Sequence, residues 1–114
     1  MNEDRLLIIS RIKKTYEYID KSLESFPHKY INLKNKIENT LFEMLELCYY
    51  ANYNLDKNNN QLMCLAKLSM VDYYLKLSYK NELISKKKYI SIAKHLSEIK
   101  LMIRKWNEIS ETSC

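Results

Sequence analysis

Residues 84–106 read ISKKKYISIAKHLSEIKLMIRKW, and the apolar residues of this stretch decide the fold. They recur at spacings of three and four residues, which places them along one face of an α-helix: Tyr89, Ile92, Leu96, Ile99, Ile103 and Trp106. Ser85 precedes this row as a candidate N-cap, because its hydroxyl can accept a hydrogen bond from an amide of the first turn. The stretch predicts an amphipathic helix over residues 86–110 whose apolar face enters a core.

Three earlier segments show the same helical periodicity. We expect helices at about residues 3–25, 33–55 and 61–80. The first should end before Pro27, since the residue preceding a proline is disfavoured in the helical conformation. The polar run DKNNNQ at residues 56–61 predicts a break between the second and third helices. The third helix has an expected core row with Asp72 at its edge: Leu62, Leu65, Leu68 or Ser69, Asp72, Leu75 and Tyr79.

The composition favours an all-α protein. The chain has 114 residues, no glycine and one proline, and 46% of its residues are hydrophobic. A β-rich fold of this length would need tight turns with positive φ, which glycine supplies most easily. Four helices joined by short connections usually pack as antiparallel neighbours, so we expect residues 1–114 to form one up-down-up-down four-helix bundle.

The second and third helices are apolar over more than one stripe, as in the run LFEMLELCYYANY at residues 41–53. A helix in a monomeric bundle needs an apolar stripe of about 100°. The excess indicates contact with another subunit. The alternative is a broad core stripe with scattered exposed tyrosines.

The chain lacks the signals of a membrane or secreted protein. No segment approaches the ~18 consecutive apolar residues of a membrane span, and the acidic start MNEDRLLIIS has too short an apolar run for a signal peptide. Cys48, Cys64 and Cys114 are odd in number and have no CxxC spacing, so they suggest neither a disulfide framework nor a zinc site. We expect a cytoplasmic protein with no membrane partner.

Residues with catalytic potential are scarce. Neither His28 nor His95 has a carboxylate at a spacing typical of a triad or a metal site. A phosphate-binding loop needs glycines, which are absent. We therefore expect a binding protein that is not an enzyme and that has no catalytic, cofactor or metal site.

The positive charge is concentrated near the C-terminus. The chain carries a net charge of +5, yet residues 85–106 alone carry +6. Three lysines follow Ser85 at the helix N-terminus, where the helix dipole disfavours cations and where exposed amides favour phosphate. The candidate nucleic-acid-binding residues are Lys86, Lys87, Lys88, Lys94, Arg104 and Lys105. The alternative is an ordinary solvated face in a lysine-rich protein.

Several motifs in this order resemble one family of four-helix bundles. They are Phe26-Pro27, then Leu33 and Lys36-Ile37, then the leucine-rich run LFEMLELCYYANY, and finally Ile84-Ser85, Tyr89, Leu96, Glu98-Ile99 and Trp106. Together these motifs resemble the accessory variability proteins of diversity-generating retroelements. Proteins encoded in intervening sequences of bacterial ribosomal RNA genes belong to the same wider group. The chain departs from the family before Trp106, where relatives usually carry glycines.

The resemblance implies a ring-like or barrel-like homopentamer of four-helix bundles. It also implies two partners, the reverse transcriptase of the retroelement and nucleic acid (RNA, DNA or both), in support of mutagenic copying of a template RNA into cDNA. The family has no catalytic residues to transfer to this chain. The ribosomal intervening-sequence branch implies instead an RNA-associated bundle without a polymerase partner, and a third interpretation is a purely structural oligomer.

Overall fold

The computed structural model describes residues 3–112, with side chains over residues 7–109. Its elements are α1 (Glu3–Leu23), a 3-10 turn η1 (His28–Tyr30), α2 (Ile31–Asn52), α3 (Lys57–Lys80) and α4 (Lys86–Thr112). The α1 helix ends at Leu23, ahead of Pro27, and η1 leads directly into α2. The second helix therefore begins at Ile31 rather than at residue 33.

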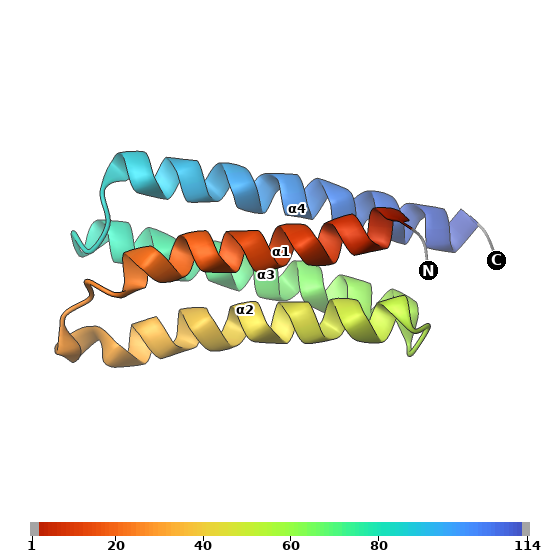
Figure 1. Ribbon diagram of the computed structural model, residues 1–114, viewed down its shortest axis with the longest axis horizontal. Coiled ribbons are helices and arrows are strands. Elements are labelled where there is room, and N and C mark those ends of the chain that lie inside the picture. Colours follow the sequence, from red (N-terminus) through yellow and green to blue (C-terminus); the bar gives the residue numbers. More distant parts are fainter. Residues whose placement is uncertain (1–2, 113–114) are drawn as a thin grey trace.

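The four helices lie side by side in an elongated body of 48 × 23 × 19 Å (Figure 1). Each helix contacts the next in sequence, and α1 also contacts α4, which closes the ring and leaves α1–α3 and α2–α4 as diagonal pairs. The turns η1 and α3–α4 lie at one end of the bundle, and the α2–α3 turn lies at the other (Figure 1). The predicted all-α class and the four packed helices are confirmed, and the contacts are consistent with an up-down bundle. Across the described residues, no helix combines the length and the apolar character needed to cross a membrane.

The apolar row of α4 faces the core as predicted. Ile92, Ile99 and Ile103 are fully buried, and Leu96 and Trp106 are nearly so. In α1, Thr15 is buried while Tyr16 lies half-buried beside the core, and the buried apolar residues recur with helical spacing: Ile8, Ile9, Ile12, Ile19 and Leu23. In each of these two helices the apolar residues lie on one face and the polar residues on the other, so only one face can be buried in the core.

The core row predicted for α3 is confirmed at Leu68 and Leu75, but at its other positions the buried residue is one place earlier than predicted. Leu62 is exposed, and the buried residues recur at spacings of three and four along a neighbouring stripe: Gln61, Cys64, Leu68, Val71, Leu75 and Ser78. This helix is apolar on both stripes, so periodicity alone does not select one. Asp72 lies at the edge of the core, as expected, and accepts a hydrogen bond from the Tyr89 hydroxyl at 3.0 Å.

The asparagine-rich segment 57–61 is helical, which corrects the expected break. The chain turns before it, where Asn54 and Asp56 adopt left-handed conformations (φ 61° and 43°) that asparagine and aspartate tolerate better than most residues. The first turn of α3 is then tied to α4, because the Asn107 amide donates to Asn58 Oδ1 and to Gln61 Oε1, both at 2.7 Å. These bonds satisfy amides that burial would otherwise leave without partners.

Two buried cysteines meet between α2 and α3. The Sγ atoms of Cys48 and Cys64 lie 3.4 Å apart, and both thiols are free. The hydrogen bond with Cys48, followed by burial, raises the pKa of the Cys64 thiol. Because the thiolate is the reactive form, this thiol should be inert in the folded protein. Cys114 lies outside the described residues.

We expect a Cys114→Ser variant to show almost no thiol reaction in the native state. Its reaction with a disulfide reagent such as dithionitrobenzoate should be slower by about 100-fold or more than in 6 M guanidinium, because both sulfur atoms are buried. Absorbance at 412 nm follows the reaction. Rapid modification of the folded protein would contradict the packing at this position.

Candidate nucleic-acid interface

The N-terminus of α4 is capped as the sequence predicts. The backbone N–H of Lys88 donates to Ser85 Oγ at 3.0 Å, and the N–H of Tyr89 donates to the Ser85 carbonyl at 3.0 Å. The first turn of α4 therefore carries Lys86, Lys87 and Lys88 at the positive end of the helix dipole. Cations at this end oppose helix stability by about 0.3–1 kcal/mol each when they are exposed.

Five of the six predicted residues share the outer face of α4. All five are exposed, and at 3.6 residues per turn they fall opposite the buried row: Lys86, Lys87, Lys94, Arg104 and Lys105. We call these five residues the outer basic face. Lys86 and Arg104 are five turns apart on nearly the same line of the helix, about 27 Å at 1.5 Å per residue. The face is therefore as long as about eight base pairs of duplex, at 3.4 Å per pair.

Little acidic charge accompanies the outer basic face within residues 84–106. Salt bridges join Arg11 to Glu98 and Lys67 to Glu43, and neither pair includes a residue of this face. Glu98, the only acid within residues 84–106, faces α1 through its bond to Arg11. Two exposed apolar residues, Ile90 and Leu101, lie between the cations. The face can therefore offer charge to phosphates and apolar contact to sugars or bases.

Lys88 is separated from the other five residues. Its ammonium group lies 3.8 Å from the centre of the Tyr18 ring on α1, a cation–π contact. The Tyr18 hydroxyl is 2.8 Å from Ser91 Oγ, and this hydrogen bond, followed by the Lys88 ammonium, lowers the pKa of Tyr18 below its ordinary value. Lys88 thus links α4 to α1 by its contact with Tyr18, which lines a groove between the two helices.

That groove contains residues that the sequence analysis did not single out. It is lined by Arg11, Lys14, Thr15, Tyr18 and His95 and has a volume of about 320 Å³. The signal in the sequence was the i, i+3, i+7 spacing of Arg11, Lys14 and Tyr18, which places two cations and an aromatic ring on one side of α1. Only the packing of α1 against α4 brings them to His95.

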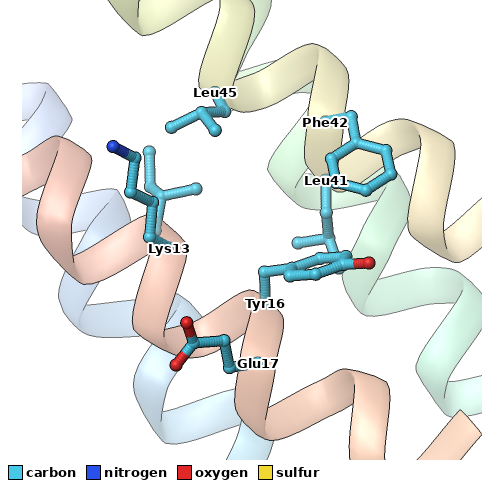
Figure 2. Close-up of a pocket in the computed structure, with 7 residues that line it drawn as sticks. Lys13, Tyr16, Glu17, Leu41, Phe42 and Leu45 are labelled. Atoms are coloured by element: carbon cyan, nitrogen blue, oxygen red, sulfur yellow. The ribbon is translucent and has the colours of Figure 1, made fainter.

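Large apolar side chains are also exposed on α2 and α3. We refer to these residues together as the exposed apolar surface of α2 and α3: Phe42, Tyr50, Leu62, Met63, Met70 and Tyr73. Figure 2 shows the adjoining pocket of about 180 Å³ between α1 and α2, which Leu41, Phe42 and Leu45 line opposite Lys13, Tyr16 and Glu17. The rings of Tyr16 and Phe42 lie 4.8 Å apart, yet half of Phe42 remains exposed. Core packing thus leaves much of the second apolar stripe uncovered.

The described residues hold no group of three or more His, Cys, Asp or Glu side chains arranged to bind a metal ion. His95 contacts the Tyr18 ring edge-on at a centroid distance of 5.2 Å, and His28 lies in η1. A scan against protein-family models and searches of curated proteins and solved structures found no match to this chain.

Proposed function

We propose that this protein is a non-enzymatic accessory protein of a diversity-generating retroelement. In this role it binds nucleic acid and the reverse transcriptase of the element and supports mutagenic cDNA synthesis. The sequence motifs from Phe26-Pro27 to Trp106 support the assignment by resemblance. No cofactor is required for such a role.

The outer basic face is the observation that carries the nucleic-acid part of the proposal. Lys86, Lys87, Lys94, Arg104 and Lys105 are exposed along about 27 Å of α4. When a row of cations neutralises phosphates, the counterions condensed on the nucleic acid are released. This release favours binding with little dependence on base sequence. Two of these lysines occupy the helix end where cations are least favourable, and local conflicts of this kind tend to mark functional sites.

The second candidate is a bundle of the ribosomal intervening-sequence type, which associates with RNA or is purely structural and has no reverse transcriptase partner. The same outer basic face suits RNA in either case. Gene neighbourhood separates the two candidates. A reverse transcriptase gene with template and variable repeats nearby favours the retroelement role, and a position within a ribosomal RNA gene favours the alternative.

Binding of RNA and DNA across a range of salt concentrations tests the nucleic-acid role. Wild-type protein should bind both at low salt and lose affinity as salt rises. A variant with Lys86, Lys87, Lys88, Arg104 and Lys105 changed to alanine should bind much more weakly. Equal and negligible binding by both proteins would reject the proposal and leave a purely structural oligomer.

Self-association is the second part of the proposal, and the exposed apolar surface of α2 and α3 supports it. Contiguous apolar patches on a protein surface commonly mark contacts between proteins. Phe42 and Met70 are 50% and 42% exposed, although each is large enough to contribute to an interface core. The family resemblance suggests a homopentamer, and the exposed apolar side chains are our candidate for the surface between its subunits.

We expect light scattering at micromolar concentration to give a mass of about 69 kDa, five times the chain mass of 13.8 kDa. A Phe42→Glu/Met70→Glu variant should shift to the monomer mass, because a buried unpaired carboxylate at an interface costs several kcal/mol. A Leu101→Glu variant on the outer face of α4 is the matched control and should retain the oligomer. A monomeric wild-type protein would exclude self-association.

A further inference from the structure

The groove between α1 and α4 has the features of a small-anion site. Arg11 and Lys14 come from α1 and His95 from α4, and all three border a space of about 320 Å³. This volume falls at the lower end of the range for small-molecule sites. Tyr18 lines the same groove, and its hydroxyl is hydrogen-bonded to Ser91 Oγ. Residues with hydroxyl, imidazole and cationic groups therefore border one space.

Thr15 gives an independent indication. Its side chain is 2% exposed and lines the groove, and its hydroxyl has no hydrogen-bond partner among the residues that the structure describes. Buried threonine hydroxyls in helices commonly donate to the carbonyl four residues earlier, as Thr40 does to Lys36 at 2.6 Å. Thr15 makes no such bond. Its hydroxyl is therefore left for a ligand oxygen, directly or through one water molecule.

The charge balance of the groove favours an anion. Arg11 and Lys14 are cations, and the Lys88 ammonium lies 3.8 Å from the centre of the Tyr18 ring, which lines the groove. Glu98 is the nearest acid, and it occupies one end of the Arg11 guanidinium at 2.5 Å. Arginine has five N–H donors in a planar fork, so this bond leaves others for a second acceptor. A tetrahedral oxyanion matches such a set of donors on several sides.

We propose that the groove between α1 and α4 binds a phosphate group through Arg11, Lys14, Thr15 and His95. The phosphate comes either from a free phosphorylated small molecule or from a nucleic-acid backbone that continues around α4. This site is distinct from the outer basic face, since its residues lie on the side of α4 that meets α1. Its existence does not rest on the nucleic-acid role proposed above.

The test is an NMR titration of the full chain with inorganic phosphate, with chloride at equal ionic strength as the reference. We expect saturable shifts at the amides of Thr15 and His95 with a Kd in the millimolar range. An Arg11→Gln/Lys14→Gln variant should weaken phosphate binding by about tenfold or more. A Glu98→Gln variant should strengthen it severalfold, because the competing carboxylate is lost.

A pair of threonine variants separates ligand binding from folding. Thr15→Val removes a hydroxyl without a protein partner, so Tm should stay constant or rise while phosphate affinity falls by about fivefold. Thr40→Val removes a hydroxyl that is bonded to Lys36, so Tm should fall while phosphate affinity stays constant. Because the Thr15 hydroxyl has no hydrogen-bond partner among the described residues, Thr15→Val should leave the fold intact, and a fall in phosphate affinity then reports on the ligand.

Two arms identify the source of the phosphate. If a short RNA shifts the same amides and competes with inorganic phosphate, the groove holds a backbone phosphate. If RNA leaves these amides unchanged while inorganic phosphate shifts them, the ligand is a free phosphate. The inference is overturned if phosphate gives no saturable shift at Thr15 and His95, or if the Thr15→Val and Arg11→Gln/Lys14→Gln variants bind it as the wild type does. That result would leave RNA binding by the outer basic face untouched.

Discussion

An Ile99→Ala variant should lose about 2–5 kcal/mol of its free energy of unfolding. Ile99 is fully buried on α4, within the core that all four helices share. Truncation removes three carbons from water-excluded contacts and leaves a cavity that rigid helices close only in part. For a domain of this size we expect Tm to fall by about 10–20 °C. Chemical and thermal unfolding followed by circular dichroism measure both quantities.

Leu101→Ala on the same helix is the matched control. Leu101 is 66% exposed, and the variant should remain within about 0.5 kcal/mol of the wild type. The contrast depends only on which side of α4 each residue occupies. Equal destabilisation by the two substitutions would mean that α4 is rotated relative to the arrangement described above, or that Leu101 is itself buried in an assembly. Light scattering of the same samples distinguishes these two cases.

The sequence predicted α1 and α4 well because each has one apolar face of strong contrast. In α4, spacings of three and four pass through Ile92, Ile99 and Ile103 with polar residues opposite, so only one orientation buries the apolar row. Ser85 was also predictable, since an N-cap depends on local chemistry and not on distant packing. The structure confirms its hydrogen bond to the Lys88 amide.

The α3 helix could not be oriented from its own sequence. Leu62 and Cys64 each begin an apolar row, and the choice between the rows depends on partners in other helices. The buried Cys64 contacts Cys48 on α2, and the buried Gln61 accepts a hydrogen bond from the Asn107 amide on α4. Such polar pairs across 46 residues have no local signature. The same limit explains why segment 57–61 was expected to be a break.

The candidate site was predictable in its composition but only partly in its geometry. The charge count identified the correct helix, and the helical repeat gathers Lys86, Lys94 and Arg104 on the outer basic face. The repeat also placed Lys88 in the same turn of the helix, yet its contact with Tyr18 required knowledge that α1 packs alongside. Arg11 and Lys14 were overlooked for the same reason. Residues from separate helices become one groove only through tertiary packing.

Neutralising the outer basic face should weaken nucleic-acid binding far more than removing the same number of charges elsewhere on the surface. The test variant changes Lys86, Lys87, Lys94, Arg104 and Lys105 to glutamine and lowers the net charge from +5 to 0. The control variant makes five equivalent changes at exposed lysines elsewhere: Lys21, Lys29, Lys36, Lys76 and Lys80. Both variants have the same net charge, so any difference between them comes from position.

The most direct test of the central claim is the slope of log K against log salt concentration for duplex binding by these three proteins. Each phosphate contact contributes about −0.9 to the slope. The outer-face variant should therefore lose up to about 4.5 from the magnitude of the wild-type slope, and the control variant should lose less than about 1. Indistinguishable slopes for the two variants would contradict the claim that the outer face of α4 is the nucleic-acid interface.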